Sequence, residues 1–207
     1  MVAIVKHEVF LSSTYADLVE ARRKVISAVL QSGCFVSSME YFPATSEEQV
    51  EFLHHIIDEC DFYLLVVGGA YGSLHNSGVS FTEREFDYAV AKKKPVIAFL
   101  RKDPDSLPDA MRETEPTRRR LFEAFCEKIK ADRIVGFWTS EDDLASQVVL
   151  ALARQKRIHA DGGWVRSDQV VNSETIEQIA KLSKDVEQSR EERDAIAKQL
   201  CRCCKLI

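Results

Sequence analysis

Residues Phe62 to Ser73 read FYLLVVGGAYGS, and this stretch decides the fold class. A continuous apolar run of this length is typical of a β-strand that is buried on both faces. Glycines follow it directly, at positions 68, 69 and 72, as is common where a strand passes into a loop. Because parallel sheets carry helices on both faces, the stretch favours a parallel sheet over an antiparallel one.

Strand-like and helical segments alternate on both sides of this stretch. Further apolar segments of strand length lie at His7–Leu11, Phe35–Met39, Val96–Leu100 and Arg133–Thr139. Helical periodicity marks the segments between and after the strands, at about 15–32, 46–60, 80–94, up to 131, and 140–159. These βα repeats predict an α/β fold with a five-stranded parallel, doubly wound sheet of the flavodoxin type.

The composition changes near residue 160, after which the chain is strongly polar. We expect an α/β domain over residues 1–160, a linker over 161–170 and a C-terminal helix over 171–207. Within 171–200, residues at alternating spacings of three and four follow the a/d pattern of a coiled coil: Ile179, Leu182, Val186, Ser189, Arg193, Ile196 and Leu200. Ser189 and Arg193 suit a buried seam poorly. Homo-oligomerisation through this helix and a lone surface helix therefore both stay open.

Composition and charge exclude several classes of protein. The chain has 207 residues, a formal net charge of −5 and 45% hydrophobic residues, enough for a real core. The negative charge argues against nucleic acid as a partner. The sequence lacks an apolar run of membrane-spanning length and a signal-peptide pattern at its N-terminus. We therefore expect a cytoplasmic protein with no membrane partner.

Cysteines and histidines do not form a recognisable metal motif. His54 and His55 are adjacent on a predicted helix, where neighbouring side chains face different directions, so we expect no metal site. The basic clusters Lys92–Lys94 and Arg118–Arg120 are expected to be solvated surface. Three single cysteines in apolar surroundings are expected to be reduced core thiols: Cys34, Cys60 and Cys126.

Three loops leave the carboxyl ends of the first three strands. They are Ser12–Thr14, Glu40–Phe42 and Gly68–Ser80, and they are rich in hydroxyl groups, glycines and aromatic rings. In open parallel sheets, ligands bind beyond the carboxyl ends of the strands. The sequence therefore predicts a binding pocket built from these loops.

Two glutamates, Glu83 and Glu85, lie at the start of the helix in SFTEREFDYAVAKKKPVIAFL, residues 80–100. Ser80 with Glu83 and Thr82 with Glu85 both match a capping box, but only one of the two frames can mark the helix start. The other glutamate is then available for chemistry. The residues by themselves leave this assignment open.

Several motifs resemble a bacterial domain of unknown function that is often the N-terminal effector of NTPase-type defence proteins. The motifs are VFLSSTYADLVEAR, MEYFPA, IIDECDFYLLVVGGAYGS and SFTEREFDYAVAKKKPVIAF, together with the strand that begins at Arg133. That family is similar to Toll/interleukin-1 receptor (TIR) domains and to nucleoside 2-deoxyribosyltransferases. The likeness covers roughly residues 6–158 and implies a flavodoxin/TIR-like sheet, a role in antiphage immunity and a sensor or NTPase partner.

The resemblance to the deoxyribosyltransferases singles out one glutamate. Their Glu-x-Gly-x-Ala segment falls on Glu85 to Ala89, with Asp87 in place of the glycine, and Lys94-Pro95-Val96 follows as in that family. The resemblance implies that Glu85 is the catalytic carboxylate and that Glu83 caps the helix. Asp87 adds a second acid, which could disfavour an anionic ligand.

The implied activity is cleavage of an N-glycosidic bond at ribose C1′, with NAD⁺ as substrate and no separate cofactor. A carboxylate can stabilise the developing oxocarbenium charge or attack C1′. Hydrolysis and cyclisation to an ADP-ribose signal both follow from this first step. The expected substrate-binding residues come from the three loops and the helix start: Phe10, Leu11, Ser12, Ser13, Thr14, Tyr41, Gly69, Tyr71, Gly72, Thr82 and Glu83. Tyr41 or Tyr71 would stack on a ring of the ligand.

Other interpretations of the same residues remain. Ser12–Thr14 could cap the first helix with Asp17 as partner, Tyr41 could be core, and the glycines could serve the turn alone. No GxGxxG or P-loop motif occurs, so a Rossmann dehydrogenase and an NTPase do not fit. Two alternative functions stay open: a non-catalytic nucleotide-sensing or protein-interaction module, and a nucleoside 2-deoxyribosyltransferase.

Overall fold

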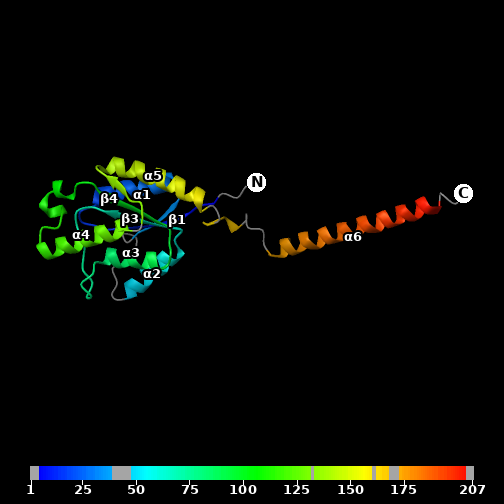
Figure 1. The fold of residues 1–207 in the computed structure, drawn as a ribbon, viewed down its shortest axis with the longest axis horizontal. Helices are drawn as coiled ribbons and strands as arrows, with labels where there is room; N and C mark the ends of the chain where they lie inside the picture. Colours follow the sequence, from blue (N-terminus) through cyan, green and yellow to red (C-terminus); the bar gives the residue numbers. More distant parts are fainter. Residues whose placement is uncertain (1–4, 39–47, 132, 160–161, 168–172, 204–207) are drawn as a thin grey trace. The chain divides into compact units, whose positions relative to one another are not determined.

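The computed structural model describes residues 5–38, 48–131, 133–159, 162–167 and 173–203 (Figure 1). The chain divides into two compact units. Residues 4–164 form one of them, and residues 165–207 belong to the other.

The first unit is built around a five-stranded, all-parallel sheet with the strand order β2-β1-β3-β4-β5. This is the flavodoxin-like order, so the predicted α/β, doubly wound fold is confirmed. The elements run β1 (Glu8–Ser13), α1 (Val19–Gln31), β2 (Phe35–Ser38), α2 (Glu48–Glu59), β3 (Phe62–Val67), α3 (Phe81–Ala91), β4 (Val96–Arg101), η2 (Pro104–Ser106), η3 (Asp109–Met111), α4 (Pro116–Ala131), β5 (Gly136–Trp138) and α5 (Glu141–Ile158).

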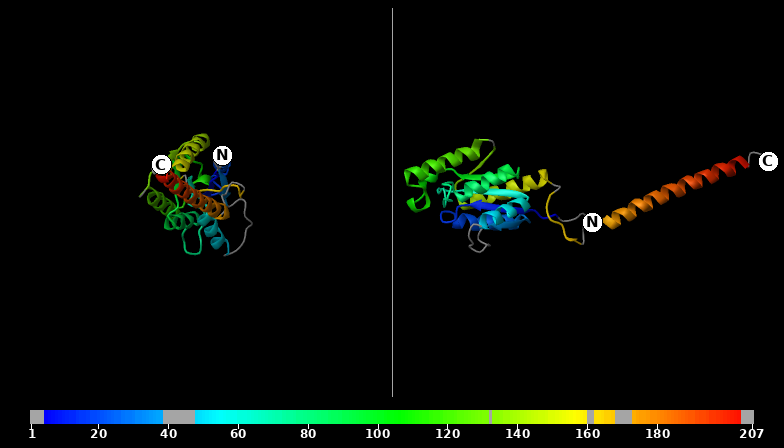
Figure 2. Two further views of the ribbon diagram at one scale, coloured as in Figure 1. Left: turned by 90° about the vertical axis from the view of Figure 1, so that its right-hand side faces the viewer. Right: turned by 90° about the horizontal axis from the view of Figure 1, so that it is seen from below.

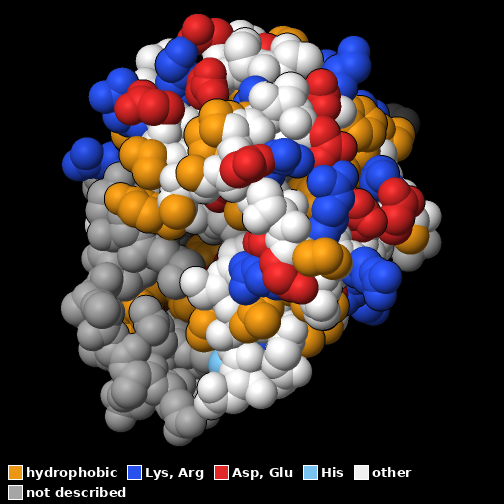
Figure 3. All heavy atoms as spheres, turned by 90° about the vertical axis from the view of Figure 1, so that its left-hand side faces the viewer, with side chains coloured by type: hydrophobic (Ala, Val, Ile, Leu, Met, Phe, Trp, Pro, Cys, Tyr) orange, Lys and Arg blue, Asp and Glu red, His pale blue; other side chains and the backbone are white. Residues whose placement is uncertain are grey.

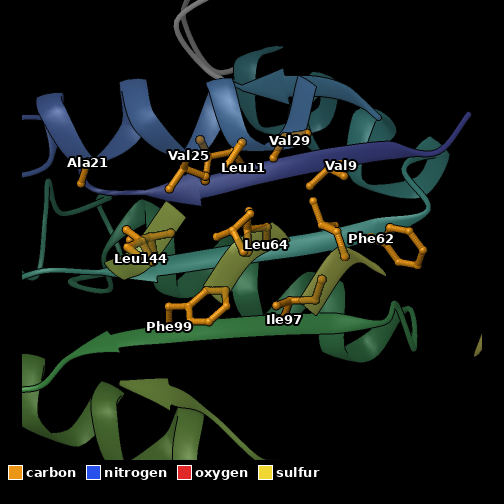
Figure 4. Packing of buried hydrophobic residues seen from close by; sticks show 14 of the residues in the cluster. Val9, Leu11, Ala21, Val25, Val29, Phe62, Leu64, Ile97, Phe99 and Leu144 are labelled. Atoms are coloured by element: carbon orange, nitrogen blue, oxygen red, sulfur yellow. The ribbon is translucent and has the colours of Figure 1, made fainter. Parts of the chain in front are cut away.

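Helices cover both faces of the sheet. Helices α1 and α5 pack on one face, and α2, α3 and α4 pack on the other (Figures 1 and 2). Strand β3 lies in the middle, and all six of its residues are buried, as its apolar sequence predicts. Its Leu64 points toward α1 and α5 (Figure 4), whereas the next residue, Leu65, belongs to the opposite core. A strand with two buried faces therefore separates two hydrophobic cores.

Several boundaries differ from the sequence expectation. Helix α1 begins at Val19, because residues 15–18 form a turn closed by a hydrogen bond from the Leu18 N–H to the Tyr15 carbonyl, 3.1 Å. Strand β5 covers only Gly136–Trp138 of the expected 133–139. Residue 39, the expected end of the second strand, and residue 46, the expected cap of the second helix, lie outside the described residues.

Two of the single cysteines are core thiols as expected, whereas one lysine of the first basic cluster has a structural role. Cys34 and Cys60 are buried free thiols, and burial raises the pKa of Cys60 to about 12. Lys94 is not solvated surface as expected: its ammonium group donates to the carbonyls of Asp58 and Cys60, at 2.6 and 2.8 Å, beyond the end of α2. Lys92 and Lys93 are exposed, as expected.

The described part of the second unit contains one long helix, α6 (Ser173–Cys203). Its apolar side chains Ile176, Ile179, Leu182 and Val186 are between 52% and 63% exposed. Across the described parts of the chain, no helix has the length and apolar character needed to cross a membrane.

Candidate active site

A cavity of about 680 Å³ opens beyond the carboxyl ends of β1 and β3, within the usual size range of ligand pockets. The chain leaves these two neighbouring strands toward opposite faces of the sheet, which makes this edge the topological switch point. Figure 3 views the molecule from this end, where acidic and basic side chains are interspersed. The lining comes from four segments: Ser13, Thr14, Tyr15, Ala16 and Asp17; Leu53; Ala70, Gly72, Ser73, Phe81 and Thr82; Glu113 and Arg118.

Asp17 clamps the glycine loop from one side. Its Oδ2 accepts the backbone N–H groups of Gly69 and Ala70, at 3.1 and 3.2 Å, and its Oδ1 accepts the Thr14 hydroxyl at 2.5 Å. The side chain is buried, and a Cβ at Gly68 would lie 2.5 Å from Oδ2. The alternative in which Ser12–Thr14 cap the first helix, with Asp17 as partner, is therefore wrong. Helix α1 has no side-chain cap, and Thr14 and Asp17 instead join β1 to the glycine loop.

Glu113 and Arg118 hold the same loop from the other side. Glu113 accepts the Tyr71 N–H at 2.8 Å, and Arg118 binds the Glu113 carboxylate through both Nε and Nη2 at 2.9 Å. Arg118 also donates to the Gly72 carbonyl at 2.7 Å. The Arg118 guanidinium holds the pKa of Glu113 below its usual value. Arg118 thus belongs to the cavity wall, and its assignment to a solvated cluster was wrong.

Glu85 lies on the inner side of α3 and is 5% exposed. Its Oε2 accepts the Ser12 hydroxyl at 2.6 Å, whereas Oε1 is buried and has no hydrogen-bond partner among the described residues. Burial raises the pKa of Glu85 to about 7, against the opposing effects of the Ser12 hydrogen bond and the Arg22 charge. A carboxyl group with one unpaired oxygen and a pKa near neutrality is an unusual feature for a core.

Glu83 has a different environment although it is only two residues away. The Ser80 hydroxyl accepts the Glu83 N–H at 3.1 Å, so the Ser80 frame marks the true start of α3. The Glu83 carboxylate accepts the Tyr71 hydroxyl and the Lys128 ammonium. Lys128 also pairs with Asp87 at 2.6 Å. The second acid of the motif is thus held by Lys128 on an exposed side of α3, whereas Glu85 is buried.

Residues 8–153 match the family described as Domain of unknown function (DUF4062). The chain belongs to the DUF4062 family. No protein of curated function matches its sequence.

Solved structures with a similar fold are distant from this DUF4062 domain. A Clostridium botulinum CMP N-glycosidase, BcmB, is 16% identical, covers 70% of this chain and 98% of its own, and has a TM-score of 0.46. The TIR domains of the activated Roq1 resistosome are 14% identical over 87% of this chain and 99% of their own, with a TM-score of 0.41. A prokaryotic SEFIR domain is 15% identical over 62% and 94%, with a TM-score of 0.37. At these levels the likeness concerns the fold alone.

The DUF4062 domain brings together only part of the predicted site. Ser13, Thr14, Gly72 and Thr82 line the cavity, and Gly72 has a φ of 89° that favours glycine. Glu85 and Ser12 lie behind the lining rather than in it. Thr82 lines the cavity and lies one helical turn before Glu85, on the same side of α3.

Other predicted residues have structural roles. Tyr71 is 2% exposed and packs edge-on against Phe125, so its proposed stacking on a ligand is wrong for this structure. The side chains of Phe10 and Leu11 are fully buried in the two cores. Gly69 bonds to Asp17 and Glu113 instead of lining the cavity, and Glu83 does not line it either. Tyr41 lies outside the described residues.

The lining also contains residues that sequence reasoning missed. Tyr15 and Phe81 contribute aromatic rings, and Glu113 with Arg118 contributes an ion pair from a distant segment. Tyr15 directly follows the hydroxyl-rich loop, so its position was a usable signal. Glu113 and Arg118 come from a polar loop and a helix start that carry no local mark of their role.

Replacing Asp17 by Ala should lower the free energy of unfolding by about 1–3 kcal/mol, because two N–H groups at the carboxyl end of β3 lose their acceptor. Urea denaturation followed by circular dichroism measures this change. Asp142→Ala is the matched control, since the Asp142 side chain is 85% exposed and pairs only at the surface with Lys24. It should cost less than about 1 kcal/mol. Equal losses of unfolding free energy in Asp17→Ala and Asp142→Ala would contradict the role of Asp17 in holding the glycine loop.

Stability should depend on pH through Glu85. Because its pKa rises from 4.5 to about 7 on folding, the folded state holds the proton more tightly. This contribution is complete below pH 4.5 and is lost as the pH rises through 7. At about 1.4 kcal/mol per pH unit, it totals on the order of 3 kcal/mol. Urea denaturation between these pH values should show that the wild type loses this free energy of unfolding relative to Glu85→Gln as the pH rises. An identical pH dependence of the unfolding free energy in both proteins would refute the raised pKa of Glu85.

Proposed function

We propose that this DUF4062 domain cleaves an N-glycosidic bond at ribose C1′, with NAD⁺ or a related nucleotide as substrate and Glu85 as the catalytic carboxylate. One observation carries the proposal. Glu85 is a buried carboxyl with a pKa of about 7 that accepts a hydrogen bond from Ser12, and the cavity residue Thr82 lies one helical turn before it. Such a group, next to a cavity at a switch point, is a candidate for chemistry.

The reaction needs Glu85 in its ionised form. As the bond between C1′ and the nicotinamide nitrogen breaks, its electron pair moves to the nitrogen and cancels the positive charge of the ring. The sugar develops oxocarbenium character, which a carboxylate stabilises or captures covalently. Water then completes hydrolysis, or a nitrogen of the same molecule completes cyclisation. A cationic ligand would itself favour the ionised carboxylate.

The remaining acids of the cavity favour a leaving group that is already charged. A neutral base would need a proton from a second acid. Both oxygens of Asp17 already accept hydrogen bonds, and Glu113 is paired with Arg118, which lowers its pKa. Neither is suited to donate a proton. Nicotinamide in NAD⁺ needs none, and this difference favours NAD⁺ cleavage over deoxyribosyl transfer between neutral bases.

A second candidate function is a nucleotide-sensing module that binds such a ligand without cleaving it. The observation in its favour is that Glu85 is 5% exposed and does not line the cavity. For catalysis, a ligand or an activating partner must move α3 or the glycine loop so that Glu85 reaches the cavity. Sensing requires no such movement. In either case the resemblance of the motifs to effectors of defence proteins favours a role in antiphage immunity, controlled by a sensor or NTPase partner.

Glu85→Gln should reduce NAD⁺ consumption by at least about 100-fold, because the amide cannot supply the negative charge that the transition state needs. Chromatography of NAD⁺, nicotinamide and ADP-ribose products at high protein concentration measures it. Glu83→Gln is the matched control and should stay within a few-fold of wild type, since Glu83 faces Lys128 rather than the cavity. The wild-type rate should rise with pH through about 7 as Glu85 ionises.

Equal rates for wild type and Glu85→Gln would remove the catalytic role. Absence of turnover in every sample, combined with binding of NAD⁺ in calorimetry, would select the sensing module instead.

A further inference from the structure

The glycine loop beside the cavity is an anion-binding nest that the protein fills with its own carboxylates. In phosphate-binding loops, successive backbone N–H groups point at the ligand. Here the N–H groups of Gly69 and Ala70 donate to Asp17, and that of Tyr71 donates to Glu113. Three consecutive donors at the carboxyl end of β3 are therefore unavailable to a phosphate group.

The start of α3 also has few free backbone N–H groups for an anion. The Phe81 N–H donates to the Ser73 carbonyl at 3.1 Å, and the Glu83 N–H donates to the Ser80 hydroxyl. Helix N-termini bind phosphate through such first-turn N–H groups when these are free. Two of them are satisfied inside the domain.

The charged side chains of the lining lead to the same conclusion. They comprise two carboxylates, Asp17 and Glu113, and one guanidinium, Arg118. Arg118 already donates to Glu113 through two nitrogens and to the Gly72 carbonyl. Among the described residues, the lining thus holds one more negative charge than positive charge. A phosphate group here would meet repulsion, whereas a cation would meet attraction.

Tyr15 provides the face that a flat cation needs. Its side chain lines the cavity and is 61% exposed, and it lies between the hydroxyl of Thr14 and the carboxylate of Asp17 in sequence. An aromatic face attracts a positively charged ring. The hydroxyls of Ser13 and Thr14 already donate to the Thr14 carbonyl and to Asp17, so they can serve a sugar as acceptors, and the Thr82 hydroxyl lies on the same lining.

We propose that the cavity binds the phosphate-free N-ribosyl pyridinium end of its substrate, stacked on Tyr15, and that any phosphate groups lie outside the cavity. This inference rests on the proposed function and narrows its substrate class. The ligand recognised is nicotinamide riboside or the equivalent half of a dinucleotide. The diphosphate contributes little to binding.

Binding measurements separate this inference from catalysis. Calorimetry on the full chain compares nicotinamide riboside, nicotinamide mononucleotide and NAD⁺, with Glu85→Gln used where the wild type turns the ligand over. The riboside should bind within about 3-fold of the two phosphorylated ligands, which corresponds to less than about 1 kcal/mol. Tyr15→Ala should weaken all three about 10-fold, and Tyr15→Phe should not.

Each result decides one question. A riboside that binds at least about 10-fold more weakly than the mononucleotide would overturn the exclusion of phosphate. Unchanged binding in Tyr15→Ala would overturn the stacking role, and Tyr15 is exposed enough for the variant to fold. Absence of binding for all three ligands would remove both this inference and the proposed function. Binding as expected without turnover in the wild type would remove only the catalytic proposal.

A different observation, in the second unit, carries an independent inference about α6. Ile179, Leu182 and Val186 occupy consecutive a, d and a positions of a heptad and are between 52% and 63% exposed. In this frame Asp185 takes a g position and Arg190 takes the e position of the next heptad. In a parallel two-stranded coiled coil, a g residue meets the e residue that follows on the partner helix.

We infer that α6 pairs in parallel with α6 of a second copy of this chain. Asp185 of each copy then faces the opposite charge at Arg190 of the other, on both sides of the seam. Arg193, at an a position, faces its own copy across the seam and weakens the pair. The repulsion between the two Arg193 side chains predicts a dimer that forms only at raised protein concentration. Such a weak dimer suits an activity that is controlled by assembly.

Sedimentation equilibrium of the full chain tests the pairing. Arg193→Leu should tighten the dimer by at least about 10-fold, because it removes a like-charge contact from the seam. Asp185→Arg should weaken the dimer, and Asp185→Arg combined with Arg190→Asp should restore it. A double variant that stays as weak as the single one would exclude the parallel register. A chain that remains monomeric at every concentration, Arg193→Leu included, would overturn the pairing.

Discussion

Burial of β3 on both faces is the constraint on which the rest of the structure depends. Because its side chains occupy two hydrophobic cores, the charged side chains that line the cavity lie beyond its carboxyl end. At the carboxyl end the chain turns through Gly68 to Gly72, where backbone N–H groups leave the sheet without ladder partners. Buried donors need acceptors. Asp17 and Glu113 supply them and so fix the loop that forms one wall of the cavity.

Asp17, Glu113 and Glu85 differ in the donors that surround their carboxylates. Asp17 accepts two N–H groups and a hydroxyl, and Glu113 accepts an N–H group and a bidentate arginine. Glu85 accepts one hydroxyl, and burial dominates its pKa. The first two acids are therefore structural. The scarcity of donors around Glu85 is what makes it suited to proton exchange or to the stabilisation of a cation.

The same arrangement links the fold to the proposed substrate. In phosphate-binding proteins, the backbone N–H groups of a glycine loop after a buried strand donate to phosphate. Here the corresponding N–H groups already donate to Asp17 and Glu113. The cavity is left with hydroxyl groups, an exposed tyrosine and an excess of negative charge among its described residues. These features suit a sugar joined to a cationic ring. The site thus differs in character from the nucleotide sites of Rossmann and P-loop proteins, although the architecture is related.

The sequence by itself determined the α/β class, the five strands and the position of the glycine loop, because hydrophobic periodicity reports local burial. The resemblance of the motif singled out Glu85 rather than Glu83, but only the structure showed that Glu85 is the buried one of the two. Only the tertiary structure decided that Tyr71 is core, that Asp17 is a clamp and that Arg118 joins the cavity wall. These roles depend on contacts between segments more than 40 residues apart. Local pattern cannot encode such pairings, since the same charged residue is solvated or buried according to what the fold places beside it.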